Sequence, residues 1–226
     1  MKPVSTAFLL FPNVTQLDLT GPAQVLSRMG PGKLDLVAKT LEPVPTDAGF
    51  SILPTATFAD VRQADILCIP GGFGIHDAME DAETIAWVQE VAAAAEWVTS
   101  VCTGALLLGA AGLLRGYKAT THWASHEQLA WFGAEPVKER VVFDRNRVTG
   151  GGVTAGIDFA LALTAAVRGE AHARMVQLSL EYDPAPPFDS GSPERAGEAL
   201  VAAYEARAAR LAPGREARVR AVADRM

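Results

Sequence analysis

The chain has little cysteine, no excess of positive charge and no long hydrophobic run. Only two of its 226 residues are cysteines, Cys68 and Cys102. Two cysteines in a chain of this length do not make a disulfide framework, and such a small number is typical of a reducing compartment in which thiols stay free. We therefore expect a cytoplasmic protein whose cysteines are unpaired.

The charge balance and the apolar runs exclude two classes of partner. A net charge of −6 argues against nucleic-acid binding, because proteins bind the phosphate backbone through a basic surface. The apolar run at residues 6–11 is too short to span a bilayer, and Pro12-Asn13 follows it in place of a signal cleavage site. We expect neither a nucleic-acid partner nor a membrane partner.

Hydrophobic residues, by contrast, make up 49% of the chain, which is enough for one sizeable core. Short apolar runs alternate with longer helical patterns, and this alternation predicts an α/β fold with a mostly parallel sheet sandwiched by helices. The expected strands are residues 4–11, 34–39, 64–70 and 97–101, with hairpins at 43–58 (off the main sheet) and 137–148. The expected helices are residues 20–29, 81–95, 103–114, 154–167 and 170–182, with a short one that a capping box at Ser125 begins.

The C-terminal part differs in composition from the rest. Residues 183–193 are rich in proline, and residues 194–226 form an Ala/Arg/Glu-rich helical pattern broken at Pro213-Gly214. We divide the chain into an α/β domain, 1–193, and a helical extension, 194–226, which is too short to be a domain of its own. The extension packs either on the body of the domain or against a second subunit.

Cys102 is the first candidate for chemistry. It follows a buried strand and directly precedes a helix, which resembles a nucleophile elbow at the carboxyl edge of a sheet. A helix N-terminus favours the thiolate, the nucleophilic form, and so predicts a lowered thiol pKa. The alternative is a small buried cysteine that fills the core, which is what we expect of Cys68 in the middle of its strand.

Asp18 is the second candidate. It stands between Leu17 and Leu19, just after the first strand, where an aspartate commonly caps a helix or a turn. The flanking leucines predict partial desolvation, which raises a carboxyl pKa, and a carboxylic acid near a thiolate can shuttle a proton. This role requires the first strand to lie beside the strand that ends at Cys102.

Glycines follow one of the buried strands at the same expected edge. The backbone N–H groups of Gly71 and Gly72, with that of Thr103, are candidates to bind substrate by stabilising developing negative charge, and a tight turn explains the glycines equally well. A dinucleotide site is excluded because the third glycine and the first-strand placement are missing. Residues 150–152 indicate a turn rather than a phosphate cradle.

His122 and His126 are spaced four residues apart, as a metal-binding pair on one face would be. No Cys, Asp or Glu stands at ligand spacing beside them, so we interpret both as structural residues. We therefore expect no metal at this pair.

At this point the chain resembles the DJ-1/PfpI superfamily, in residues 11–22, 69–72 and 100–105. Residues 119–123, 150–158 and 181–188 are similar to the isocyanide (isonitrile) hydratase branch. The resemblance covers nearly the whole chain. It implies a flavodoxin-like sandwich, a homodimer and no cofactor.

Two residues separate the branches of the superfamily. Protease-like and chaperone-like members have histidine where this chain has Thr103, and the DJ-1 and glyoxalase-type branches have glutamate where it has Asp18. Both differences point to the hydratase branch, although a domain found in some transcription regulators shares them.

The expected function is hydration of an isocyanide to an N-substituted formamide, which makes the chain a hydro-lyase. Cys102 would attack the isocyanide carbon to give a thioimidate, Asp18 would supply the proton and then activate water, and Thr103 with the Gly72 N–H would orient the reacting groups. Three alternatives stay open: another thiol activity of the superfamily (glyoxalase-like hydration or amide hydrolysis), a regulatory module without turnover, and a redox sensor.

Overall fold

The main sheet has seven strands in the order β10-β11-β7-β6-β1-β2-β5, in a computed structural model that describes residues 1–226. All neighbouring strands are parallel except β10, which forms an antiparallel hairpin with β11. The strands are β1 (Val4–Leu9), β2 (Gly32–Ala38), β5 (Ala56–Thr57), β6 (Ile66–Ile69), β7 (Trp97–Val101), β10 (Val141–Asp144) and β11 (Arg147–Gly150). The predicted mostly parallel α/β sheet is confirmed.

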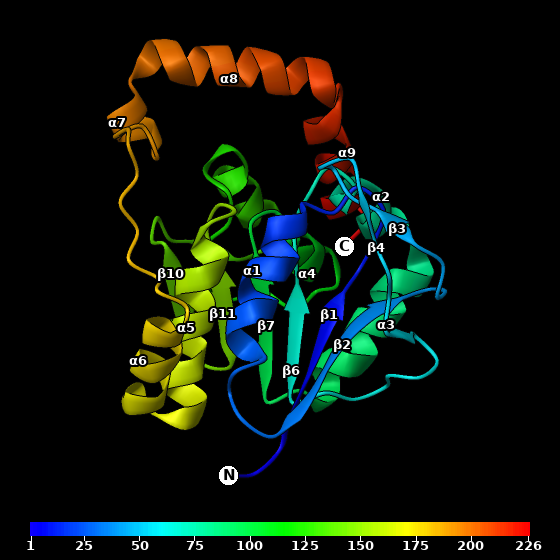
Figure 1. The fold of residues 1–226 in the computed structure, drawn as a ribbon. Helices are drawn as coiled ribbons and strands as arrows, with labels where there is room; N and C mark the ends of the chain where they lie inside the picture. The colour runs from blue at the N-terminus through cyan, green and yellow to red at the C-terminus, as the bar shows by residue number, and fades with distance from the viewer.

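Helices cover both faces of this sheet (Figure 1). One layer consists of α1 (Gln16–Leu26), α5 (Ala155–Arg168) and α6 (Glu170–Ser179). The other consists of α2 (Ile75–Glu80), α3 (Ala82–Ala94) and α4 (Gly104–Ala110). With both faces covered, the central strand β6 is buried at every position, which explains why its sequence is a continuous apolar run rather than an alternating one.

The first helix begins earlier than predicted. The Thr20-Gly21-Pro22 pattern predicts a helix start, but α1 begins at Gln16 and has Pro22 in its interior. The proline ring packs closely on α5, where a Cβ at Gly156 would lie 3.1 Å from Pro22 Cδ. Packing between α1 and α5 thus outweighs the local cost of an interior proline, and it places Asp18 in the first turn of the helix.

Two other local predictions are corrected. The short helix expected at Ser125 is a 3-10 helix, η1 (Trp123–Phe132), and its N-cap is His122, whose Nδ1 accepts a hydrogen bond from the Ala124 N–H at 3.3 Å. Of the hairpin predicted at 43–58, β3 (Val44–Pro45) and β4 (Ser51–Ile52) do pair off the main sheet, but β5 joins the edge of the sheet. The short parallel pair β8 (Lys118–Ala119) and β9 (Glu135–Pro136) was not predicted.

The C-terminal residues form three helices, α7 (Pro193–Ala196), α8 (Glu198–Leu211) and α9 (Arg215–Ala223), with the predicted break at Pro213-Gly214. The last of these packs on the body through the buried side chains of Val219 and Val222. In contrast, α8 buries only Ala208 and crosses above the carboxyl ends of the strands (Figure 1). None of the helices combines the length and apolar character needed to cross a membrane.

Candidate active site

The turn between β7 and α4 has the geometry of an elbow. Cys102 adopts a φ of +54°, a left-handed conformation that costs a non-glycine residue about 1–3 kcal/mol and persists only when surrounding contacts enforce it. Gly104 lets the start of α4 approach the end of β6, because a Cβ at this position would lie 2.1 Å from the Ile69 carbonyl oxygen. The expected strand-to-helix turn at Cys102 is therefore present.

Three backbone and side-chain contacts enforce this conformation. The Cys102 N–H donates to the carbonyl oxygens of Gly151 at 2.8 Å and Gly150 at 3.1 Å. The Thr121 hydroxyl donates to the Cys102 carbonyl oxygen at 2.6 Å. Sequence reasoning missed the part that Thr121 plays, since nothing in its local pattern distinguishes it from any other loop threonine.

The Cys102 side chain is nearly enclosed, and its residue is 6% exposed. Burial raises the pKa of the Cys102 thiol well above its ordinary value, and the negative charge of Asp18 raises it further. The Thr103 backbone N–H opposes this shift only in part. The expected lowering of the pKa is thus wrong: α4 is seven residues long, and its N-terminal field does not offset desolvation.

Asp18 lies against this thiol although their strands are not neighbours. Strand β6 separates β1 from β7, contrary to the requirement drawn from the sequence. The segment after β1 instead crosses the end of β6, where the Thr15 N–H donates to the Gly71 carbonyl oxygen at 3.0 Å. The first turn of α1 thereby brings the Asp18 carboxyl to the Cys102 thiol.

The Asp18 carboxyl is completely buried, with 0% exposure. Burial raises its pKa from 3.8 to about 7, in the direction predicted, while the contact with the Cys102 thiol and the Gly71 N–H lower the pKa in part. Its Oδ2 accepts a hydrogen bond from the Gly71 N–H at 3.0 Å. Its Oδ1 is buried without a hydrogen-bond partner, so it is free to exchange a proton with a bound group.

The two glycines after β6 donate hydrogen bonds to other residues of the site, whereas the sequence predicted that they donate to a substrate. The Gly71 N–H donates to Asp18, and the Gly72 N–H donates to Thr103 Oγ1 at 3.1 Å. A Cβ on Gly71 would lie 2.8 Å from Asp18 Oδ2 and 2.6 Å from Thr103 Oγ1. Both N–H groups form hydrogen bonds within the protein and position Asp18 and Thr103. The prediction that they are free to donate to a substrate is therefore wrong.

The remaining candidates are not part of the Asp18–Cys102 pair. Cys68 is fully buried in β6, as predicted, and burial raises the pKa of its thiol to about 12. His122 has its pKa lowered to about 4 by burial, and His126 is buried with no hydrogen-bond partner at either ring nitrogen. No three His, Cys, Asp or Glu side chains gather closely enough to hold a metal ion.

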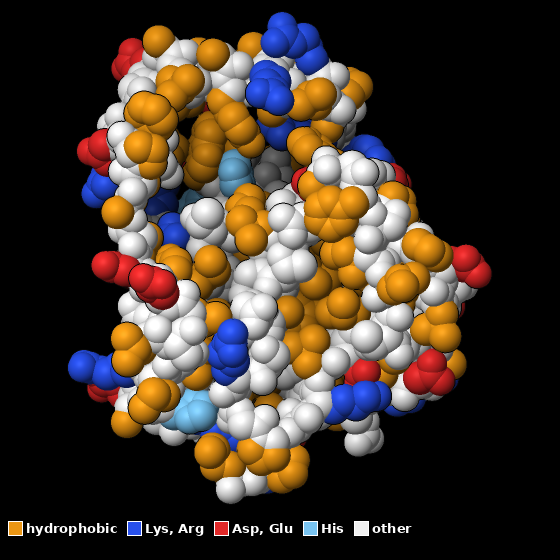
Figure 2. All heavy atoms as spheres, viewed as in Figure 1, with side chains coloured by type: hydrophobic (Ala, Val, Ile, Leu, Met, Phe, Trp, Pro, Cys, Tyr) orange, Lys and Arg blue, Asp and Glu red, His pale blue; other side chains and the backbone are white.

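A cavity of about 630 Å³ opens beside the elbow. Figure 2 shows a hollow below α8, with a histidine side chain on its wall. The residues that line this cavity include Thr121, His122, Trp123, His126, Lys138, Arg140, Gly151 and Gly152. The two segments that hold the Cys102 backbone therefore also form part of the wall of an open cavity, while the side chains of Asp18 and Cys102 lie behind this wall.

Comparisons with known proteins agree with this geometry. The model of the DJ-1/PfpI family matches residues 4–166. The isonitrile hydratase of Pseudomonas putida is 55% identical over 202 residues, which cover 89% of each chain. The crystal structure of a THiJ/PfpI family protein from Pseudomonas syringae superimposes with a TM-score of 0.92 at 45% identity and covers 99% of this chain and 91% of its own.

A more distant relative is a regulator. The HTH-type transcriptional regulator GbdR of Pseudomonas aeruginosa is 28% identical over 187 residues, which cover 79% of this chain but only 50% of the regulator. The similarity to the hydratase is thus both higher and more complete. The matched residues 4–166 contain every strand of the main sheet and the complete Asp18–Cys102 site, and the chain belongs to the DJ-1/PfpI family.

Proposed function

We propose that the chain hydrates isocyanides, R–N≡C, to N-substituted formamides, with Cys102 as the nucleophile. The observation that carries the proposal is the buried pair of Asp18 and Cys102, whose carboxyl and thiol are in contact. The 55% identity with the isonitrile hydratase of Pseudomonas putida supports the choice of substrate.

The first step forms a carbon–sulfur bond. Because the raised pKa keeps the Cys102 thiol protonated, the sulfur needs a base as it attacks, and the Asp18 carboxylate is that base. The sulfur bonds to the terminal isocyanide carbon, and the proton held by Asp18 passes to the same carbon. The product is a thioimidate, R–N=CH–S–Cys102, and Asp18 is again a carboxylate.

The second step adds water to the thioimidate carbon. Asp18 removes a proton from the water as the water oxygen bonds to carbon, and it passes that proton to the nitrogen, which becomes N–H. The tetrahedral intermediate, R–NH–CH(OH)–S–Cys102, then breaks its carbon–sulfur bond. Formamide leaves, and the hydroxyl proton returns to the sulfur, so one water is consumed in each turnover.

Thr103 and the glycines keep these groups in position. The Thr103 oxygen accepts from the Gly72 N–H, and its hydroxyl contacts the Cys102 sulfur, from which it can turn to the substrate nitrogen. The Gly71 N–H holds Oδ2 of Asp18. We assign Thr103 to substrate orientation and both glycines to positioning.

The burial of the thiol favours this function over redox sensing. Oxidation-sensitive cysteines are exposed and have low pKa values, whereas Cys102 is 6% exposed and its pKa is raised. A cytoplasmic location and a homodimer remain part of the proposal, supported by two unpaired cysteines and by membership of the family.

The test is formamide release by the purified protein from benzyl isocyanide, followed by liquid chromatography. Intact-protein mass spectrometry during turnover is expected to show an adduct of one isocyanide per chain, and peptide mapping is expected to place it on Cys102. Methylglyoxal and a peptide amide serve as alternative substrates. Turnover of either of these without turnover of the isocyanide would overturn the proposal.

A further inference from the structure

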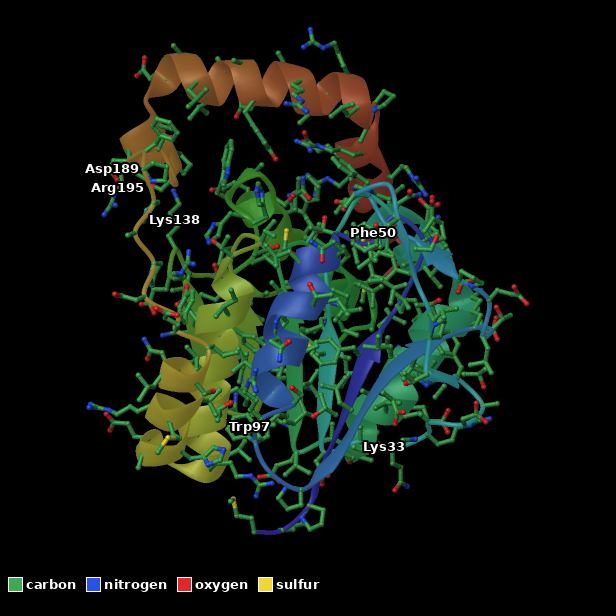
Figure 3. The ribbon with its side chains drawn as sticks, viewed as in Figure 1. Lys33, Phe50, Trp97, Lys138, Asp189 and Arg195 are labelled. Atoms are coloured by element: carbon green, nitrogen blue, oxygen red, sulfur yellow. The ribbon has the colours of Figure 1, made fainter.

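Helix α8 contributes little to the core, since only Ala208 of its residues is buried. After its C-terminal end, Arg218 of α9 pairs with Asp77 and Glu80 of α2, each at 2.7 Å, and ties this end to the body. Before its N-terminal end, Asp189 of the connecting segment pairs with Arg195 of α7 at 2.9 Å, and Figure 3 labels both residues on this connection. The helix thus crosses the opening above the strand ends with its C-terminal end tied to the body.

One side chain of α8 nevertheless reaches the body of the protein. The ring of Tyr204 lies 5.0 Å from the ring of Trp123 and 6.1 Å from that of His122, measured between centroids. These separations are typical of interacting aromatic rings. Tyr204 remains 40% exposed, so the cluster presents a free aromatic face.

This aromatic cluster stands next to the elbow. The ring of His122 packs against Gly152, where a Cβ would lie 3.3 Å from its Cδ2, and the neighbouring Gly151 accepts the Cys102 N–H. On the other side, His122 directly follows Thr121, which holds the Cys102 carbonyl. Burial raises the pKa of Tyr204, so its hydroxyl is uncharged at neutral pH.

A second cavity of about 250 Å³ lies between α8 and Trp123. It is lined by Trp123, Ser190, Gly191, Ser192, Pro193, Ala196, Leu200, Val201 and Tyr204. None of these is an acidic or basic side chain, and His122 at its edge is neutral at physiological pH because burial lowers its pKa to about 4. The space is suited to an uncharged apolar group.

We propose that Tyr204 is a specificity-determining residue that packs on the N-substituent of the isocyanide while the isocyanide carbon meets Cys102. The inference rests on the proposed function. It adds that α8, outside the residues 4–166 matched by the family model, forms the outer wall of the site. Arg215 is the charged group that acts on both His122 and Tyr204, so an anionic substituent is the competing occupant.

The experiment compares two isocyanides that differ only in the substituent, benzyl and methyl. For Tyr204→Ala, we expect kcat/KM for benzyl isocyanide to fall about tenfold, mainly through KM, because a stacking face is lost. We expect the value for methyl isocyanide to stay within about twofold, since a methyl group does not reach the ring. Tyr204→Phe keeps the ring and is expected to retain the wild-type ratio of kcat/KM for benzyl isocyanide to kcat/KM for methyl isocyanide.

Leu211→Ala is the matched control, because Leu211 is on the same helix, is 60% exposed and lines neither cavity. This variant is expected to keep the wild-type kcat/KM for both substrates. If Tyr204→Ala leaves the ratio of kcat/KM for benzyl isocyanide to kcat/KM for methyl isocyanide unchanged, the inference is overturned. A preference of the wild type for isocyanoacetate over benzyl isocyanide would also overturn it.

A binding measurement separates this inference from the proposed function. Calorimetric titration with N-benzylformamide needs no turnover, and the Kd is expected to rise about tenfold in Tyr204→Ala and to stay unchanged in Leu211→Ala. If the wild type hydrates neither isocyanide, the proposed function fails while this titration still reports on Tyr204. If hydration occurs but the Kd does not change, Tyr204 is not part of the substituent site.

Discussion

The two cysteines of this chain are both buried, both unpaired and both have raised thiol pKa values, yet they occupy different kinds of place. Cys68 is in the middle of β6, in extended backbone, with Thr99 as the neighbour that lowers its pKa in part. Cys102 follows β7 in left-handed backbone, with the Asp18 carboxyl beside it. Burial by itself therefore does not distinguish a core thiol from a reactive one. The titratable partner and the strained turn do.

The largest difference between the two thiols is expected in activity. Cys102→Ala is expected to lower isocyanide hydration by at least about a thousandfold, because the nucleophile is lost. Cys68→Ala removes an equally buried sulfur and is expected to keep the rate within about twofold. Initial rates of formamide release measure both variants. Comparable losses in the two variants would show that sulfur burial, and not position, matters.

The Asp18 carboxyl is expected to reduce stability at neutral pH. Its folded pKa of about 7 exceeds the unfolded value of 3.8, so the folded state binds the extra proton between these values and loses stability as pH rises from about 4 to 7. The cost at higher pH is up to about 4 kcal/mol. Asp18→Asn removes this dependence.

Urea unfolding from pH 4 to 8 measures this effect. Asp18→Asn is expected to be more stable than the wild type at pH 7.5, with the advantage disappearing near pH 4. Glu127→Gln, which removes an exposed carboxyl, serves as the control. A wild-type stability that does not fall between pH 4 and 7 would contradict the raised pKa.

The same carboxyl is expected to govern the rate. Asp18→Asn is expected to lower kcat/KM about a hundredfold, the usual contribution of a general base. In the wild type, kcat/KM is expected to rise with pH through about 7 as Asp18 loses its proton, and the variant is expected to lack this limb. A pH–rate profile of both proteins makes the measurement. The same limb in Asp18→Asn would assign the titration to another group.

The smallest effect concerns the support of the elbow. Thr121→Val removes the hydroxyl that donates to the Cys102 carbonyl and is expected to cost about 1 kcal/mol of unfolding free energy, the usual net contribution of a hydrogen bond. Thr99→Val, which removes a comparable hydroxyl bonded to Leu67 beside Cys68, is the matched control. Activity is expected to fall only in Thr121→Val, since only that bond holds the strained residue. An equal loss of activity in Thr121→Val and Thr99→Val would show that the hydrogen bond to the Cys102 carbonyl has no particular role in catalysis.

Some of the site was predictable from local pattern. The run that ends at Val101, followed by Cys102 and Gly104, indicates a strand-to-helix turn because a buried strand must end where small residues begin a helix. The raised pKa of Asp18 was predictable as well, since its leucine neighbours indicate burial. The upward shift of the Cys102 thiol pKa was not predictable, because the length of α4 and the burial of the thiol are decided by packing.

Long-range placement accounts for the other differences. Nothing near Thr121 or Gly151 in the chain indicates that both hold the Cys102 backbone, because contacts between residues far apart in sequence leave no periodic signal. The start of α1 was misplaced for a similar reason. The Gly21-Pro22 pair is a local helix-start signal, but close packing on Gly156 decides its place.

The sequence alone determined the alternation of buried strands and helices, and with it the sheet edge at which Asp18, Gly71 and Cys102 are found. Hydrophobic periodicity and turn residues are local, so they can be interpreted without the fold. Only the tertiary structure decided that the start of α1 crosses the end of β6, where Asp18 meets the thiol, and that α8 brings Tyr204 against Trp123. These distances depend on how separate segments pack, and packing is a property of the folded chain as a whole.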